Sequence, residues 1–411
     1  MKPQTIRIID KWVGQPLCGL LTLFRTATSP LTKKSRPLRK ILFIKFIEQG
    51  ATVLAYPAIK RAIELVGREN VYFWVFEENR PVLDFLDIIP SENIYTVRTS
   101  SIFTFLFDIM RTLRQIRREK IDATIDMEFF TRAPAILSYL TGACRRVGMH
   151  RFTSEIPYRG NLMTHRIQYN PYLHTAVTYY TLVESLLRDP SETPMVKCKL
   201  ADIDLSPPSF NPSEKEKIRM QETLSQIAGR NVERPIVLLN PNASDLIPIR
   251  RWPKECFADL GKRILTDHPR VTIVITGSPS EKDTALEVSR EIGSERIVNM
   301  AGKTTLRELL VLYTISDILV TNDSGPVHFA SLTNINSVCL FGPETPRLYG
   351  PLGNRAYVIT SDLACSPCVN VYNHRFSPCR DNTCMKTITV EEVYKVVSSL
   401  LSKIDTKEHS K

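Results

Sequence analysis

Short apolar runs alternate with helical patterns along most of this chain. The runs ILFIKFI (41–47) and VYFWVF (71–76) flank a segment, 51–66, in which apolar residues recur with a helical period. A second alternation of the same kind covers residues 235–342. Several runs are apolar throughout, which is typical of strands buried on both faces of a parallel sheet. The pattern predicts two α/β units with helices on both faces of each sheet.

The predicted elements follow one another in a regular βα order. In the first unit they are strands 41–47, 71–76, 94–97, 122–127 and 145–149, with helices 51–66, 103–118 and 132–141. In the second unit they are helix 213–228 and then strands 235–240, 271–277, 296–300, 317–323 and 337–342, with helices 254–266, 280–292, 306–313 and one beginning at 325.

A proline-rich stretch, 189–212, separates the two alternations and is typical of a linker. A chain of 411 residues is also long enough for two domains. We therefore expect two doubly wound, Rossmann-like domains at 41–205 and 206–388. An amphipathic, basic segment (1–40) precedes them, and a C-terminal helix and tail (389–411) follow.

The N-terminal segment contains the apolar run WVGQPLCGLLTLF (12–24), which is too short to cross a membrane. Six basic residues follow it between positions 25 and 40. An apolar segment followed by a basic cluster is typical of an interfacial membrane anchor. A helix packed on the protein, followed by a solvated basic linker, fits the same pattern, and both interpretations stay open.

The net charge of +11 favours an anionic partner such as a phosphorylated ligand or an anionic lipid surface. A nucleic-acid partner is not indicated, because no module of interleaved aromatic and basic residues accompanies the charge. Isolated cysteines, five of the nine in the chain, are typical of a reducing compartment. Neither G-x-G-x-x-G nor a P-loop follows the first strand of either unit, which disfavours a dehydrogenase or an ATPase.

The stretch TNDSGPVHFA (321–330) carries the strongest candidate chemistry. A buried strand ends here, and Pro326 opens a helix whose free N–H groups attract anions. Gly325 would let a phosphate approach the backbone, and Ser324 and His328 could reach the same site. The alternative is a plain helix cap made by Asp323 or Ser324, with His328 packed.

Two other loops at predicted strand ends carry polar candidates. In LLNPNASDLIPIRRWP (238–253), Arg250 and Arg251 could clamp a diphosphate, or could belong to a basic loop that leads to a helix. In TGSPSEKD (276–283), Glu281 could accept hydrogen bonds from a ribose or base. It could equally be a first-turn glutamate stabilised by the helix dipole.

Three of these motifs resemble those of glycosyltransferase family 9, the heptosyltransferase-like enzymes. TNDSGPVHFA resembles the family's D-[ST]-G-P-x-H signature, and RRWP (250–253) resembles its K-R-W-P segment. Residues 45–62 resemble the strand, turn and helix with which the family's fold opens. The resemblance covers roughly residues 40–400. It implies the glycosyltransferase B fold and inverting sugar transfer from a nucleotide-diphosphate sugar, commonly ADP-heptose, to a lipopolysaccharide-core or related glycolipid. It implies catalysis without a required cofactor or metal ion, by a cytoplasmic enzyme peripheral to the inner membrane.

The resemblance also implies roles for individual residues. Asp323, Ser324, Gly325 and His328 would hold the donor diphosphate and sugar, Arg250 would replace a phosphate-binding lysine, and Glu281 would contact the nucleoside. The first domain would bind the acceptor, through a loop that contains Gln49, Gly50 and Thr52.

The chain departs from the family pattern after the first strand, where members read G-D and use the aspartate as general base. Here Ala51 follows Gly50, and alanine cannot accept a proton. Glu48 is the nearest carboxylate, and our hypothesis is that it replaces the missing base. The alternative is that Glu48 points to solvent and that the chain binds a sugar nucleotide or glycolipid without catalysing transfer.

Two further clusters have open interpretations. Cys365, Cys368, Cys379 and Cys384 could bind a structural zinc ion, pair as disulfides or remain free thiols. Arginines recur along 103–118 at Arg111, Arg114, Arg117 and Arg118, where they could meet a phosphorylated lipid or sugar or form an ordinary solvated face.

Overall fold

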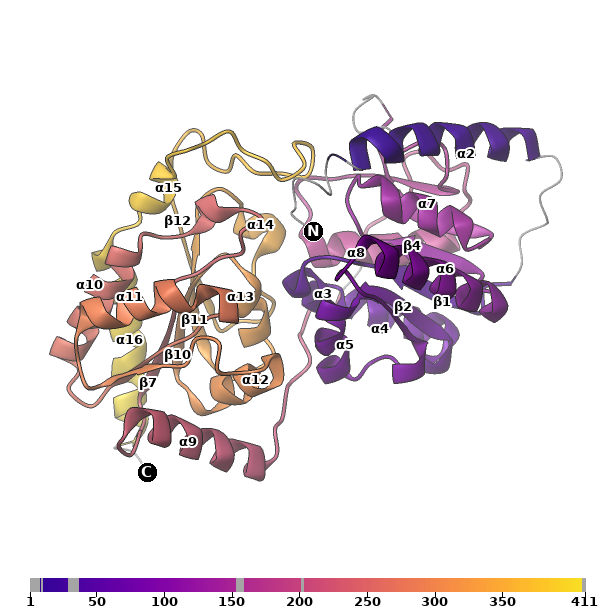
Figure 1. The fold of residues 1–411 in the computed structure, drawn as a ribbon. Coiled ribbons are helices and arrows are strands. Elements are labelled where there is room, and N and C mark those ends of the chain that lie inside the picture. The colour runs from indigo at the N-terminus through magenta and orange to yellow at the C-terminus, as the bar shows by residue number, and fades with distance from the viewer. Residues whose placement is uncertain (1–7, 9, 29–36, 153–158, 201–202, 409–411) are drawn as a thin grey trace. The chain divides into compact units, whose positions relative to one another are not determined.

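The structure is a computed structural model that describes residue 8 and residues 10–28, 37–152, 159–200 and 203–408. Its residues divide into two compact units, Met1–Leu205 and Ser206–Lys411. Each unit holds a parallel six-stranded sheet with helices on both of its faces (Figure 1). The predicted fold class, two doubly wound Rossmann-like domains, is therefore confirmed.

The sheet of the first unit has the strand order β3-β2-β1-β4-β5-β6. The order reverses between β1 and β4, which are neighbours, with Ile44 opposite Asp126. Loops that leave such a reversal diverge and open a crevice at the carboxyl ends of the strands. The strands are β1 (Ile41–Ile44), β2 (Val71–Phe76), β3 (Ile94–Val97), β4 (Ala123–Asp126), β5 (Arg145–His150) and β6 (His165–Gln168).

The helices of the first unit lie in two layers, and an additional helix packs on one of them. Ile109 of α6 and Leu137 of α7 share a buried cluster with Leu42 of β1, so α6 and α7 cover the same face of the sheet. Helix α2 packs on α7 through Cys18 and Ile136. The helices are α2 (Gln15–Thr28), α3 (Gln49–Leu54), α4 (Tyr56–Val66), α5 (Arg80–Leu86), α6 (Ile102–Glu119), α7 (Arg132–Leu140) and α8 (Thr175–Glu184).

The sheet of the second unit has the order β12-β11-β10-β7-β8-β9, which is the same topology as in the first unit. Its reversal lies between β7 and β10. The strands are β7 (Ile236–Asn240), β8 (Thr272–Ile275), β9 (Ile297–Asn299), β10 (Ile318–Asn322), β11 (Asn336–Phe341) and β12 (Ala356–Thr360). The helices are α9 (Glu214–Ala228), α10 (Lys254–Asp267), α11 (Lys282–Ile292), α12 (Leu306–Ile315), α13 (Gly325–Ala330), α14 (Pro346–Tyr349), α15 (Thr383–Lys386) and α16 (Val390–Glu408).

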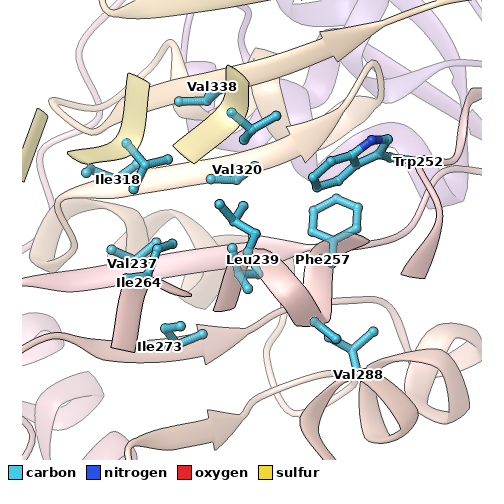
Figure 2. Packing of buried hydrophobic residues seen from close by; sticks show 14 of the residues in the cluster. Val237, Leu239, Trp252, Phe257, Ile264, Ile273, Val288, Ile318, Val320 and Val338 are labelled. Atoms are coloured by element: carbon cyan, nitrogen blue, oxygen red, sulfur yellow. The ribbon is translucent and has the colours of Figure 1, made fainter. Parts of the chain in front are cut away.

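One face of this second sheet forms a large apolar core (Figure 2). Val237, Leu239 and Val320 of the strands pack there against α10, α11 and α16. Trp252 and Phe257 meet edge to face with their ring centroids 5.0 Å apart. The indole Nε1 of Trp252 also donates to the carbonyl oxygen of Ile388, at 2.9 Å. These contacts fix the segment just before α10, which is where Arg250 lies.

The structure differs from the predicted elements at a few places. The predicted helix 51–66 is two helices, α3 and α4, because Pro57 has no N–H to donate back to the preceding turn. The strands β6 (HRIQ) and β12 (AYVIT) were not predicted. Both are edge strands. In β6 two buried residues alternate with polar ones that are more exposed, and β12 is mostly apolar but has no buried position.

The N-terminal apolar run forms the end of a short π-helix (Asp10–Gly14) and most of α2. Among the helices that the structure describes, none is long and apolar enough to cross a membrane.

Candidate active site

The carboxyl ends of β7 and β10 are joined by the side chain of Asn322. Its Oδ1 accepts a hydrogen bond from the backbone N–H of Trp252 (2.9 Å), and its Nδ2 donates to the carbonyl oxygen of Asn242 (3.1 Å). Asn322 is fully buried, so both bonds are shielded from water. The amide therefore fixes the loop after β7 against the end of β10, at the strand reversal where doubly wound domains bind ligands.

Arg250 lies at this reversal, beside two buried carboxyl groups. Its Nη1 is 3.7 Å from Oδ2 of Asp323 and 3.5 Å from Oε2 of Glu344. These distances exceed those of a tight charge-assisted hydrogen bond. Nε of Arg250 is buried and has no hydrogen-bond partner among the described residues. The guanidinium group is thus held by charge at 3.5–3.7 Å rather than by tight hydrogen bonds to Asp323 and Glu344.

Arg375 completes the cluster through a two-pronged contact with Glu344. Its Nε and Nη2 donate to Oε1 and Oε2 of Glu344 at 2.9 and 2.8 Å. Its guanidinium group also lies 5.0 Å from the ring centroid of Tyr349. We call Arg250, Asp323, Glu344 and Arg375 the arginine–carboxyl cluster.

Burial changes the protonation of this cluster. It raises the pKa of Glu344 well above its usual range, and the carboxylate of Asp323 raises that pKa further, whereas Arg250 opposes both effects. Burial also raises the pKa of Asp323, again against the charge of Arg250. The two carboxyls therefore take up a proton more readily than isolated carboxyls do. Each proton held there leaves positive guanidinium charge in excess, which favours an anionic ligand.

The other residues of the predicted donor motif follow directly after β10. Ser324 precedes α13, and its hydroxyl donates to the carbonyl oxygen of Asn322, at 3.2 Å. Gly325 begins α13 with Pro326 in the first turn, and His328 is buried within this helix. The structure thus brings the motif to the same edge of the sheet as Arg250, and its contacts with a donor stay predictions.

Glu281 lies beside the end of β8, next to β7. Its Oε2 accepts a hydrogen bond from the backbone N–H of Ser278, at 2.7 Å, as part of a capping box. A Cβ on Gly277 would lie 3.4 Å from this oxygen and 3.1 Å from Nδ2 of Asn242, so Glu281 and Asn242 flank the same backbone position. One oxygen of Glu281 therefore caps a helix, and contact with a nucleoside stays a prediction.

In the first unit, Glu48 lies after β1 at the corresponding strand reversal. Its backbone adopts a left-handed conformation, with φ 69° and ψ 84°, directly before α3. Such a conformation is strained for any residue but glycine, at a cost of roughly 1–3 kcal/mol. Its Oε2 lies 3.5 Å from Nζ of Lys45, and its side chain is 22% exposed. The carboxylate is thus positioned by a neighbouring cation while it remains accessible.

Glu128, at the end of β4, fixes the backbone around Glu48. Its Oε2 lies 3.1 Å from Nζ of Lys45. Its Oε1 accepts hydrogen bonds from the backbone N–H groups of Phe46 and Ile47, at 2.8 and 3.0 Å. Lys45 is buried, with a side chain that is 1% exposed, and it bridges Glu128 and Glu48. These contacts tie the end of β1 to the end of β4.

The rest of the predicted acceptor loop belongs to α3. Nε2 of Gln49 donates to the carbonyl oxygen of Glu78, at 2.7 Å. Gly50, Ala51 and Thr52 are buried within the first unit. In this conformation the partly exposed groups of the loop are therefore Glu48 and Gln49, and the role of Thr52 stays a prediction.

Sequence reasoning missed Lys45, Glu128, Glu344 and Arg375. Three of them could have been found, because Lys45 directly follows the apolar run of β1, and Glu128 and Glu344 lie two or three residues beyond β4 and β11. The carboxyl ends of neighbouring parallel strands meet at one edge of a sheet. Arg375 carries no such signal, since it lies more than thirty residues from β11 in an irregular loop.

The four cysteines near the C-terminus are free thiols in the structure. Within the part of the chain that the structure describes, no three His, Cys, Asp or Glu side chains are arranged to hold a metal ion. Sγ of Cys368 lies 3.3 Å from Oγ of Ser377, and Sγ of Cys379 lies 2.9 Å from the carbonyl oxygen of Asp381. A structural zinc site therefore stays a prediction, and the four thiols are not arranged as zinc ligands in this structure.

Proteins with similar sequences are heptosyltransferases. A lipooligosaccharide heptosyltransferase 2 of Campylobacter jejuni subsp. jejuni serotype O:6 is 27% identical over 187 residues, which cover 45% of this chain and 56% of that protein. The chain thus spans about half the length of this curated relative. A lipopolysaccharide heptosyltransferase 1 of Campylobacter coli is 23% identical over 361 residues, 86% of this chain and 95% of that protein.

The fold is similar to that of a solved Escherichia coli ADP-heptose lipopolysaccharide heptosyltransferase II. The TM-score is 0.68 at 20% identity, and the match covers 89% of this chain and 99% of the other. The glycosyltransferase B fold expected from the motifs is therefore confirmed. The sequence pattern of glycosyltransferase family 9 (heptosyltransferase) matches residues 109–376, well over half of the chain. This chain therefore belongs to glycosyltransferase family 9.

Proposed function

We propose that this protein is an inverting glycosyltransferase that moves a heptose-like sugar from a nucleotide-diphosphate sugar to a lipopolysaccharide-core or related glycolipid. ADP-heptose is the favoured donor, because the similar Escherichia coli structure is named for it. The observation that carries the proposal is the position of Arg250, beside Asp323 and Glu344 at the strand reversal of the second unit. A diphosphate needs concentrated positive charge at such an edge, and the guanidinium group of Arg250 supplies positive charge there.

In this proposal the second unit stabilises the leaving group. As the bond between the anomeric carbon and the diphosphate breaks, its electron pair stays on the phosphate oxygen, where negative charge grows. Arg250 and the excess charge of the arginine–carboxyl cluster stabilise that oxygen without a metal ion. Ser324 and His328 would hold the phosphates and the sugar, and Glu281 the nucleoside.

The first unit would supply the general base. Glu48 accepts the proton of the acceptor hydroxyl, while the hydroxyl oxygen attacks the anomeric carbon on the side opposite the diphosphate. The ammonium group of Lys45 lies 3.5 Å from the carboxylate of Glu48 and positions it, and Glu128 holds Lys45 in place. The strained backbone of Glu48 supports this role, since strain of this kind concentrates at functional sites.

A non-catalytic sugar-nucleotide or glycolipid binder is the second candidate. It is favoured by Ala51, which stands where the family carries its catalytic aspartate and is itself buried. Donor binding is expected for both candidates, whereas sugar transfer is expected only for the enzyme. With a glycolipid acceptor, the protein would act at the cytoplasmic face of the inner membrane.

The test has two stages. ADP-, GDP- and UDP-sugars are first compared by thermal unfolding, where a donor at 100–1,000 times its Kd should raise stability by about 3–4 kcal/mol. ADP-heptose and a heptose-free core glycolipid are then incubated with the protein, and the product is identified by mass spectrometry. If no nucleotide sugar stabilises the protein, both candidates are wrong. Stabilisation without transfer supports the binder.

A further inference from the structure

The outward side of α2 is apolar along its length. The side chains of Trp12, Leu20, Leu23 and Phe24 are 71, 64, 70 and 62% exposed. With Val13 and Leu17, they recur every three or four residues from the short π-helix into α2, so they form one stripe. Soluble surfaces rarely expose so many large apolar side chains together.

The opposite side of α2 already holds the helix on its own unit. Cys18 and Leu21 pack against α7. Oγ1 of Thr22 accepts a hydrogen bond from the backbone N–H of Asn161 (2.9 Å), and Nη1 of Arg25 donates to the carbonyl oxygen of Met163 (3.2 Å). The exposed stripe is therefore not the face by which α2 joins the fold, and it remains for another partner.

Helix α6 adds a second exposed apolar stripe. Phe103 is 82% exposed, and Leu106, Phe107 and Met110 are each more than half exposed. The same spacing continues to exposed Arg114 and Arg118, so one stripe changes from apolar to basic along the helix.

Helices α2 and α6 lie on the same side of the first sheet. Both α6 and α7 cover one face of this sheet, and α2 packs on α7 (Figure 1). Nε of Arg117 in α6 also donates to the carbonyl oxygen of Leu140, at the end of α7, at 2.8 Å. We call the exposed residues of these two stripes the α2–α6 surface; they are Trp12, Val13, Leu17, Leu20, Leu23, Phe24, Phe103, Leu106, Phe107, Met110, Arg114 and Arg118.

We propose that the α2–α6 surface binds an anionic lipid membrane. Its apolar side chains would enter the boundary between headgroups and acyl chains, with Trp12 at the level that tryptophan prefers. Arg114 and Arg118 would meet anionic headgroups, in keeping with the chain's net charge of +11. A second copy of the chain fits less well, because the same surface on that copy offers no acidic side chain to meet Arg114 and Arg118.

Membrane binding also fits the proposed function, since a glycolipid acceptor lies in a membrane. The evidence for membrane binding, however, is the exposed side chains of the α2–α6 surface and not the proposed function. Binding can therefore be measured without donor or acceptor. The full-length protein is sedimented with vesicles of phosphatidylcholine alone and with vesicles that contain about 30% phosphatidylglycerol, at low and high salt. We expect binding to the anionic vesicles that weakens as the salt concentration rises.

The variants L20S/L23S/F24S and F103S/F107S change exposed side chains, so we expect both to fold. Each should weaken vesicle binding by about tenfold or more, because apolar area no longer enters the lipid. Ile218→Ser is the matched control, since Ile218 is 57% exposed on α9 of the second unit. It should bind vesicles as the unmodified protein does.

The proposal is overturned if anionic vesicles do not bind the protein, or if the α2 and α6 variants bind as tightly as the control. It is also overturned if sedimentation shows a dimer that these variants dissociate while vesicle binding is unchanged. Stabilisation of the same variants by a nucleotide sugar tests the donor site separately, so failure of the surface and failure of the proposed function are distinguishable.

Discussion

The buried ammonium group of Lys45 holds the carboxylate of Glu48, with 3.5 Å between Nζ and Oε2. Lys45 follows β1 directly, and Glu48 comes three residues later, where the backbone turns into α3. The pair connects a rigid strand of the fold to a partly exposed acid. It therefore gives the acid a defined position, which a glutamate at a mobile turn would not have.

If Glu48 is the general base, Glu48→Gln should lower kcat by about 10²–10⁴-fold, because glutamine cannot accept the proton. Binding of the nucleotide sugar should change little, since the donor residues lie in the second unit. The measurement is steady-state kinetics with the true donor and acceptor. Glu64→Gln is the control, because Glu64 is a surface glutamate paired with Arg61 on α4. Unchanged turnover in the Glu48 variant would rule out this assignment.

Replacement of Arg250 should weaken donor binding. Arg250→Ala should raise the Kd for ADP by about 10–100-fold, the usual effect of losing a hydrogen bond to a charged group. Arg250→Lys should recover part of the loss, because the charge remains but the planar fork is lost. Titration calorimetry measures both, with exposed Arg290→Ala of α11 as the control. A Kd that does not change in Arg250→Ala would place the diphosphate elsewhere.

Donor affinity should depend on pH through the arginine–carboxyl cluster. Burial raises the pKa of Glu344 and of Asp323, so these carboxyls take up a proton as the pH falls. Each proton removes a negative charge beside Arg250, so ADP should bind more tightly at lower pH. In Glu344→Gln the residue is neutral at every pH, and the dependence should be flatter. Equal pH dependence in both proteins would show that Glu344 is not its source.

The stability of the protein should fall in mild acid through His165. Burial, with a smaller effect from Arg145, lowers the pKa of His165 from 6.5 to about 4. Between these values the unfolded chain binds a proton that the folded protein does not. This stability is present above pH 6.5 and is lost as the pH falls towards 4, at roughly 1.4 kcal/mol per pKa unit.

The variant His165→Gln should remove this part of the pH dependence, by up to about 3 kcal/mol between pH 7 and pH 4. The measurement is the free energy of unfolding from urea titrations at several pH values. His150, whose pKa is also lowered to about 4 by burial, remains in both proteins, so a smaller slope is expected rather than none. The same slope in the variant would exclude His165 as its source.

The C-terminal thiols should react as separate groups. Cys365 and Cys379 are exposed, whereas Cys384 is buried and its pKa is raised by that burial. We expect fast modification of the first two by a thiol reagent and slow modification of Cys384. A chelator should not alter these rates. Protection of all four thiols that a chelator abolishes would instead support the zinc site.

Most of the fold could be predicted because its central strands are apolar throughout. Strands β1, β7 and β10 are buried along their whole length, and each begins with three or four consecutive apolar residues. Two of the four edge strands, β6 and β12, were not predicted. Strand β6 is buried at only two of its four positions, and β12 is mostly apolar but buried at none. A local pattern therefore identifies buried strands better than edge strands.

The site was predicted only where its residues follow one another along the chain. Asp323, Ser324 and His328 lie in one motif, and Arg250 precedes a second. Arg375 joins the site through Glu344, from a distant irregular loop, and residue spacing gives no information about such a contact. Glu344 was overlooked although it lies only three residues beyond β11, at the same edge of the sheet. Lys45 was overlooked for another reason, since a lysine at the end of an apolar run is usually solvated, whereas this one is buried between two glutamates.

The backbone of Glu48 has a consequence for protein engineering. Glycine adopts the left-handed conformation at position 48 without strain, so Glu48→Gly should relieve part of the local cost. A screen for heat resistance would therefore accept this substitution, whereas a screen for sugar transfer would reject it. Position 48 is thus one at which selection for stability and selection for activity favour different amino acids.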